Sequence, residues 1–249
     1  MDLHLWSEAV QRYLAPDLPG YWQFADDNMM LIAGEIDWML RFVAVQPSDH
    51  GPWFYLNWGI QPLPVPKGYC GSSSIGNRVG QVSRGGSWDE PVDLAGYEPV
   101  MAEIARCISA EVVPEFDRYG TVDGYIRHVR KHMNRLADRG REWIDPHADE
   151  ELVYLSLLLN DLATAERAAE FARRAAADEI ETHPDPAQWV LDVHARVEHV
   201  MHVARTDNNE AVRILQENAR FTAKSIRIPP PCFGMAPAAD HRESLNDPR

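Results

Sequence analysis

Polar side chains alternate with aromatic residues in the first third of the chain, a combination typical of binding surfaces. Tryptophan and tyrosine supply large contact areas, and arginine, amide and hydroxyl groups supply directed hydrogen bonds to a ligand or partner. In the opposing interpretation, the rings fill a core and the polar groups satisfy strand ends and turns. Both interpretations stay open at this point. The candidate ligand- or partner-binding residues are Arg41, Gln46, Ser48, Tyr55, Asn57 and Arg78.

Two groups of histidines have the spacing of metal ligands on a helix. His128 and His132 are four residues apart, which places both on one face of a predicted helix. The His-Glu-x-x-His pattern is absent there, and the neighbouring side chains are mostly basic. The second group is His194, His199 and His202. These histidines are either ordinary polar residues of a helix or ligands in a metal-dependent hydrolase. We expect surface or packed histidines in both places, and no metal site.

Motifs for nucleophilic catalysis or phosphate binding do not stand out. Ser72-Ser73-Ser74 lies in a glycine-bounded segment, but no local signature ties a histidine and a carboxylate to it. Residues 80–86 are glycine-rich and lack the lysine and Ser/Thr pair of a phosphate loop. We therefore expect no catalytic residues and no cofactor, and we favour a non-catalytic function over an enzyme.

The charge balance is strongly acidic. The 249 residues include 38 acidic and 24 basic side chains, which gives a formal net charge of −14. Binding to nucleic acid requires a surplus of lysine and arginine to neutralise phosphates, so we expect no nucleic-acid partner. A basic protein partner fits this charge. The acidity lies in residues 1–96 and 146–249, whereas the middle of the chain is nearly neutral and contains a basic helix from Tyr125 to Arg141.

The cysteines and the apolar runs indicate the compartment. Cys70, Cys107 and Cys232 are widely spaced and form no Cys-x-x-Cys pair, so reduced thiols are expected. No apolar run approaches the roughly 20 residues of a membrane helix, and the first residues lack the pattern of a secretion signal. We expect a cytoplasmic protein that does not bind membranes.

Short apolar runs between turn signals organise the first 96 residues. Leu3, Trp6, Val10 and Leu14 share one face of a predicted N-terminal helix. Aromatic and β-branched residues then recur in short runs, which predicts consecutive antiparallel strands. An irregular loop with one more short strand is expected from residue 68 to residue 96. The predicted strands are 29–33, 38–45, 53–60 and about 78–82.

From residue 97 onward the apolar residues follow helical spacing, and glycine and proline signals separate six predicted helices. Pro114 is expected to kink or end the first of them. The fold class is therefore α+β: an N-terminal antiparallel sheet with flanking helices, followed by an all-helical C-terminal bundle or tetratricopeptide-like hairpins. The expected divisions are an α+β domain over 1–145, a helical domain over 146–228 and a flexible tail over 229–249.

Several short segments carry a resemblance to a known family. They are Val45-Gln46-Pro47-Ser48, Phe54-Tyr55-Leu56-Asn57-Trp58-Gly59, Ile75-Gly76-Asn77-Arg78 and Val113-Pro114-Glu115-Phe116. Over about residues 1–135 the chain resembles a family of uncharacterised bacterial domains with a Gln-x-Ser and then a Tyr-x-Asn-x-Gly pattern. The resemblance implies a small α+β protein, and some relatives look like immunity components encoded beside toxins. It implies no catalytic residues.

These observations together predict a non-catalytic protein-binding protein, of interaction or immunity type, with an acidic surface. The alternative is a small-ligand-binding protein or enzyme that uses a polar and aromatic cleft on the N-terminal sheet. The two hypotheses differ in what they require of the candidate residues. A small-ligand site needs their side chains to converge on one cleft, whereas a partner-binding surface needs them to share one accessible face.

Overall fold

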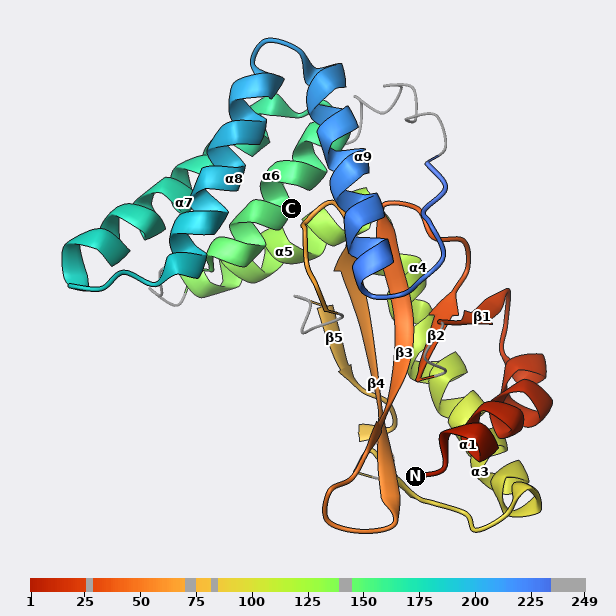
Figure 1. Ribbon diagram of the computed structural model, residues 1–249. Coiled ribbons are helices and arrows are strands. Elements are labelled where there is room, and N and C mark those ends of the chain that lie inside the picture. The colour runs from red at the N-terminus through yellow and green to blue at the C-terminus, as the bar shows by residue number, and fades with distance from the viewer. Residues whose placement is uncertain (26–28, 70–74, 82–84, 139–144, 234–249) are drawn as a thin grey trace. The chain divides into compact units, whose positions relative to one another are not determined.

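The computed structural model describes residues 1–25, 29–69, 75–81, 85–138 and 145–233 (Figure 1). The chain divides into two compact units, each considered by itself below. The first unit comprises Met1–Trp143 and Glu217–Pro231, and the second comprises Ile144–Gln216 and Cys232–Arg249. An antiparallel sheet in the first unit, followed along the chain by helices, confirms the predicted α+β class.

A six-stranded antiparallel sheet forms the centre of the first unit. The strands follow the order β1-β2-β3-β4-β5, and β6 pairs with β4 beyond the end of β5. The predicted strands at 29–33, 38–45 and 53–60 are confirmed. The strand predicted at about 78–82 lies earlier, and β6 falls inside the predicted loop. The strands are β1 Trp22–Phe24, β2 Met30–Ala33, β3 Met39–Pro47, β4 Trp53–Pro62, β5 Ile75–Arg78 and β6 Ser87–Asp89.

The first helix of this unit begins at a side-chain cap. Asp2 accepts hydrogen bonds from the backbone amides of His4 and Leu5 at 2.9 and 3.2 Å, which starts α1. Pro114 does not end its helix, because a π-helical turn, Ile108–Val112, leads into α4 and leaves proline in the first turn, where its missing N–H costs little. The helices are α1 Leu3–Ala9, α3 Leu94–Cys107, α4 Val113–Tyr119 and α5 Val122–Ala137.

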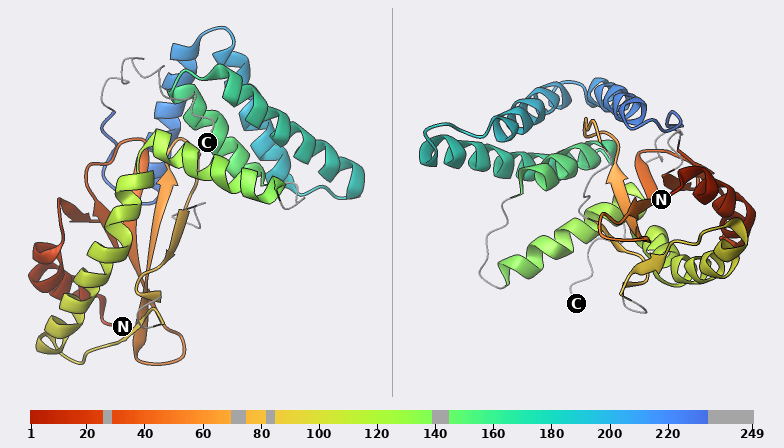
Figure 2. Two further views of the ribbon diagram at one scale, coloured as in Figure 1. Left: turned by 180° about the vertical axis from the view of Figure 1, so that it is seen from behind. Right: turned by 60° about the horizontal axis from the view of Figure 1, so that its bottom comes forward.

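One face of the sheet packs against helices α1, α3 and α4. Trp6 of α1 contacts Phe54 of β4 at 5.3 Å between ring centroids, and it contacts Tyr97 of α3 at 6.4 Å. Further along the same face, Phe116 of α4 packs 5.9 Å from Trp58. Seen from behind, the α3–α4 segment runs along the strands (Figure 2). These edge-to-face ring contacts bury the apolar residues of one sheet face and hold the strands rigidly.

The second unit consists of helices. Alanines at 165, 168, 169, 172 and 176 form a buried stripe on α7, and such small residues let neighbouring helices approach closely. The predicted helices of this region are confirmed, whereas the tetratricopeptide-like alternative stays a prediction. No helix in the described ranges is long and apolar enough to cross a bilayer. The helices are α6 Pro146–Leu158, α7 Leu162–Thr182, α8 Gln188–Ala204 and α9 Asn208–Ser225, and the residues of α9 from Glu217 onward belong to the first unit.

Candidate functional site

Side chains alternate between the two faces of the sheet, so the strand register decides which candidate residues lie together. In β4, Phe54 and Leu56 point to the helix-covered face and are buried. Tyr55 and Asn57, between and after them, therefore point to the opposite face. The register pairs Gln46 with Tyr55 and Asn57 with Arg78, which brings four predicted residues onto one face.

The part of this second face nearest the turn between β3 and β4 is accessible, and we call it the open face. It is a grid of three rows, in which β4 supplies the middle residue, the β3 side one neighbour, and β5 or β6 the other. None of its nine residues is buried; Gln46 and Asp89 are exposed and the others are half-buried. The rows are Ala44, Asn57 and Arg78; Gln46, Tyr55 and Ser87; and Ser48, Trp53 and Asp89.

Contacts within the open face fix the orientation of its larger side chains. The guanidinium carbon of Arg78 lies 3.9 Å from the centroid of the Tyr55 ring, which is a close cation–π contact. The indole Nε1 of Trp53 donates to the Tyr55 hydroxyl at 3.1 Å. In the next row, the amide of Asn57 donates to Gln46 Oε1 at 2.8 Å. The open face is therefore arranged by its own side chains.

The turn between β3 and β4 supports one end of the open face. Ser48 continues the strand register, since its backbone amide donates to the Trp53 carbonyl at 3.0 Å. The Ser48 hydroxyl accepts from the amide of His50 at 3.1 Å. A Cβ atom at Gly51 would overlap the Trp53 ring, so only glycine leaves space for the indole in its present position. The turn sequence thus determines where Trp53 lies.

Arg41 does not lie on this face, so the structure does not bring it together with the other candidate residues. It pairs with Ile60 and points to the helix-covered face of the sheet, opposite to Gln46. Its Nη2 donates to the carbonyl of Glu35 at 2.6 Å. A Cβ atom at Gly120 would lie 2.7 Å from Arg41 Cδ, which shows how closely the chain wraps this side chain. Arg41 therefore stabilises the backbone around it.

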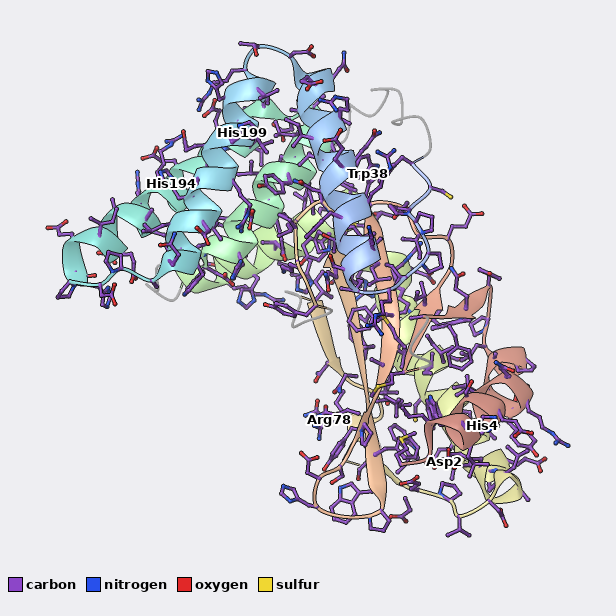
Figure 3. All side chains as sticks on the ribbon, viewed as in Figure 1. Asp2, His4, Trp38, Arg78, His194 and His199 are labelled. Carbon is purple, nitrogen blue, oxygen red and sulfur yellow. The ribbon has the colours of Figure 1, made fainter. Side chains whose placement is uncertain are left out.

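The charges of the open face lie at its two ends (Figure 3, in which Arg78 projects on the opposite side of the strands from Asp2 and His4). Among the described residues, no carboxylate forms an ion pair with Arg78. The carboxylate of Asp89 likewise has no hydrogen bond or ion pair to a described residue. Their Cα positions are four residues apart along β4, about 13 Å at the usual rise of a strand.

The structure shows what surrounds the predicted histidine groups. His128 packs edge-on against the Tyr119 ring at 4.6 Å, and burial lowers its pKa, which the nearby His132 lowers further. His194 and His199 lie at separate points along α8 (Figure 3). Within the described ranges, no three His, Cys, Asp or Glu side chains are grouped closely enough to hold a metal ion. Ser72-Ser73-Ser74 lies outside the described residues.

Three residues of the open face were missing from the sequence-based set: Trp53, Ser87 and Asp89. Trp53 lies two residues before Tyr55 on the same strand and so shares its face. Ser87 and Asp89 belong to β6, whose three residues are too short for a recognisable strand pattern. Only the pairing of β6 with β4 shows that they join the face.

No family model, curated protein or solved structure matches the chain. The resemblance to the bacterial family with the Gln-x-Ser and Tyr-x-Asn-x-Gly pattern stays a prediction. Its motif residues Gln46, Ser48, Tyr55 and Asn57 all lie on the open face. The function is therefore inferred from this geometry alone.

Proposed function

We propose that this protein acts by binding a partner protein through the open face of its sheet, without catalysing a reaction. The observation that carries the proposal is the Trp53–Tyr55–Arg78 group, whose aromatic rings and guanidinium are oriented by contacts with one another. Tryptophan, tyrosine and arginine are the residues that contribute most energy at protein interfaces. A rigid strand that presents them loses little conformational entropy on binding.

The remaining residues of the open face support the same function. Serine, asparagine and glutamine side chains adapt their hydrogen bonds to a partner, and tyrosine offers contact area at low entropic cost, as in antibody binding sites. The buried side chains of Phe54, Leu56 and Trp88, which alternate with the open face, fix its backbone from behind. The open face is thus a polar, aromatic surface on a backbone that buried side chains hold in place.

The net charge of −14 favours a partner with a basic surface, because opposite charges speed association and suppress wrong partners. An immunity-type protein that neutralises a basic toxin fits this description. Nucleic acid fits poorly, since the open face carries one arginine and one aspartate. The alternative of a small-ligand site has less support, because Arg41 lies on the other side of the sheet from Gln46.

Affinity purification from the native host with a double variant, Trp53→Ser with Tyr55→Ser, tests the proposal. The unaltered full chain is expected to retain a partner protein in an amount about equal to its own. The double variant is expected to lose this partner. The control is the pair Tyr21→Ser and Val92→Ser, since these side chains are 60% and 96% exposed and lie elsewhere in the first unit. Equal retention by both double variants would contradict binding through the open face.

A further inference from the structure

The hydrogen bonds of the open face leave several donors available around Arg78, with Asn57 Oδ1 as an acceptor beside them. Tryptophan Nε1 can only donate, so the Tyr55 oxygen accepts from Trp53 and the Tyr55 hydroxyl hydrogen points elsewhere. Gln46 Oε1 accepts from Asn57, which leaves the amide hydrogens of Gln46 to donate. The Arg78 guanidinium, lying over the Tyr55 ring, adds five N–H donors. This end of the face therefore suits an acceptor with negative charge.

A carboxylate fits these donors better than a chain of phosphates does. A guanidinium binds a carboxylate through two parallel hydrogen bonds, and stacking on Tyr55 already holds the Arg78 group in place. A nucleic acid presents many phosphates, and it would meet a single cation on a chain with a net charge of −14. Asp89, at the other end of the face, would repel a polyanion further.

Asp89 supplies the second charge of the surface. It is exposed, lies opposite Trp53 and has no described cation beside it. A partner that covers the face brings its own groups over both ends, and like charges there would cost binding energy. Arg78 and Asp89 thus favour a partner that is acidic at one end of the contact and basic at the other, about 13 Å apart.

We infer that the partner crosses the open face in one orientation, with an acidic side chain bound to Arg78 and a basic side chain bound to Asp89. This inference rests on the proposed function, since it names the chemistry of the partner at the same site. The partner is basic in its net charge, which the net charge of −14 favours, and the single acidic group selects the orientation. The aromatic centre supplies affinity, and the two charges supply specificity.

A library of 12-residue peptides displayed on phage, selected on the immobilised full chain, provides the probe. Enriched peptides are expected to carry Asp or Glu on one side of an apolar centre and Lys or Arg on the other. Synthetic versions should bind the Arg78→Gln variant about tenfold or more weakly, because a charged hydrogen-bonded pair is lost. The Asp89→Asn variant should bind them a few-fold more weakly, since this pair is more exposed.

Two further variants make the test decisive. The double variant Arg78→Glu with Asp89→Arg should select peptides with the two charges exchanged. Arg118→Gln is the matched control, since its side chain is 62% exposed elsewhere in the first unit, and it should leave the affinity unchanged.

The possible failures are distinguishable. Peptides that lose affinity with Trp53→Ser and Tyr55→Ser but bind Arg78→Gln normally would overturn the inferred polarity and leave the proposed function standing. Peptides insensitive to all of these variants, or the absence of any enrichment, would count against both. Enriched peptides that contain no acidic residue would also overturn the inference.

Discussion

Arg78 and Arg196 each lie beside a tyrosine, and their surroundings differ. In the first unit, Arg78 stacks on Tyr55 without a described carboxylate partner. In the second unit, Arg196 of α8 donates through Nε and Nη2 to both oxygens of Glu150 on α6, at 2.7 and 2.9 Å. Glu150 also accepts from the Tyr154 hydroxyl at 3.0 Å. The donors of Arg196 are satisfied within the fold, and those of Arg78 are left for another molecule.

This difference separates a stabilising cluster from a binding surface. Glu150 is fully buried, so its charge requires Arg196 and Tyr154 as permanent partners. Arg78 is half-buried and forms no ion pair with a described residue, so the fold does not depend on a charged partner for it. Perturbing the first group should therefore change stability, and perturbing the second should change binding. The predictions below test this distinction, from the largest expected effect to the smallest.

The largest effect is expected from Arg196→Met. The substitution leaves a buried carboxylate at Glu150 with only the Tyr154 hydroxyl as donor, and it should lower the free energy of unfolding by about 3 kcal/mol. The value lies at the low end for buried pairs, because the Arg196 side chain is 35% exposed and solvent screens part of its attraction. Urea denaturation measures the change.

Arg78→Met is the matched control for that experiment. Removing a cation that forms no ion pair with a described residue, while keeping an apolar side chain over Gly86, should change the free energy of unfolding by less than about 0.5 kcal/mol. A loss similar to that of Arg196→Met would mean that Arg78 is a structural residue, and the contrast between the two arginines would disappear.

Removing the Tyr154 hydroxyl should cost more stability than removing the Tyr55 hydroxyl. Tyr154→Phe removes a buried hydrogen bond to a charged acceptor and should cost about 1.5 to 2 kcal/mol of unfolding free energy. Tyr55→Phe removes the acceptor of the Trp53 indole at a half-buried site, where water replaces it, and should cost about 0.5 kcal/mol or less. Urea denaturation of both variants under one condition compares them, and equal losses would contradict the contrast.

At alkaline pH, the stability of the fold should depend on two buried tyrosines that must stay neutral. Burial, followed by the charge of Glu150, raises the pKa of Tyr154 well above its ordinary value of 10. Burial, followed by the charges of Glu90 and Asp2, raises the pKa of Tyr97 to about 12. The folded chain keeps protons that the unfolded chain releases, so stability is complete below pH 10 and falls as the pH rises above it.

The expected slope is about 1 kcal/mol per pH unit for each tyrosine between pH 10 and 11. Urea denaturation at pH 8, 10 and 11 measures it, and Tyr154→Phe should reduce the slope even though its stability at pH 8 is lower. A slope unchanged by this substitution would show that Tyr154 ionises as readily in the folded chain as in the unfolded one.

Much of the sheet was predictable because its signal is local. Runs of aromatic and β-branched residues between turns predicted β2, β3 and β4, and the candidate set contained five residues from the three rows of the open face. The separation of Arg41 from the other candidate residues could have been predicted from the spacing. Arg41 is five residues before Gln46 on one strand, and an odd spacing places two side chains on opposite faces. Register, more than residue type, decided membership of the site.

The buried cluster of the second unit could not be predicted from sequence. Asp149, Glu150 and Glu151 resemble the acidic residues that favour the start of an exposed helix, yet all three are buried. Their burial depends on tertiary packing: the partner of Glu150 is 46 residues away on another helix, and no local pattern connects the two. The same holds for β6, which becomes recognisable only through its pairing with β4.

The smallest effect concerns the orientation of Trp53. Gly51→Ala places a methyl group where the indole ring lies, so the ring must move and its hydrogen bond to Tyr55 should break. Because the ring is half-buried, the cost in unfolding free energy should stay below about 0.5 kcal/mol. The indole N–H resonance of Trp53, identified in the NMR spectrum with Trp53→Phe, should shift.

Gly68→Ala is the control, since no atom lies within 4 Å of the added Cβ, and it should leave that resonance in place. If Gly51→Ala also left it unchanged, Trp53 would already be mobile and the open face would not be arranged before binding. Its affinity would then have to include the cost of ordering the indole. A shifted resonance together with weakened partner binding would instead show that the turn stabilises the orientation on which recognition depends.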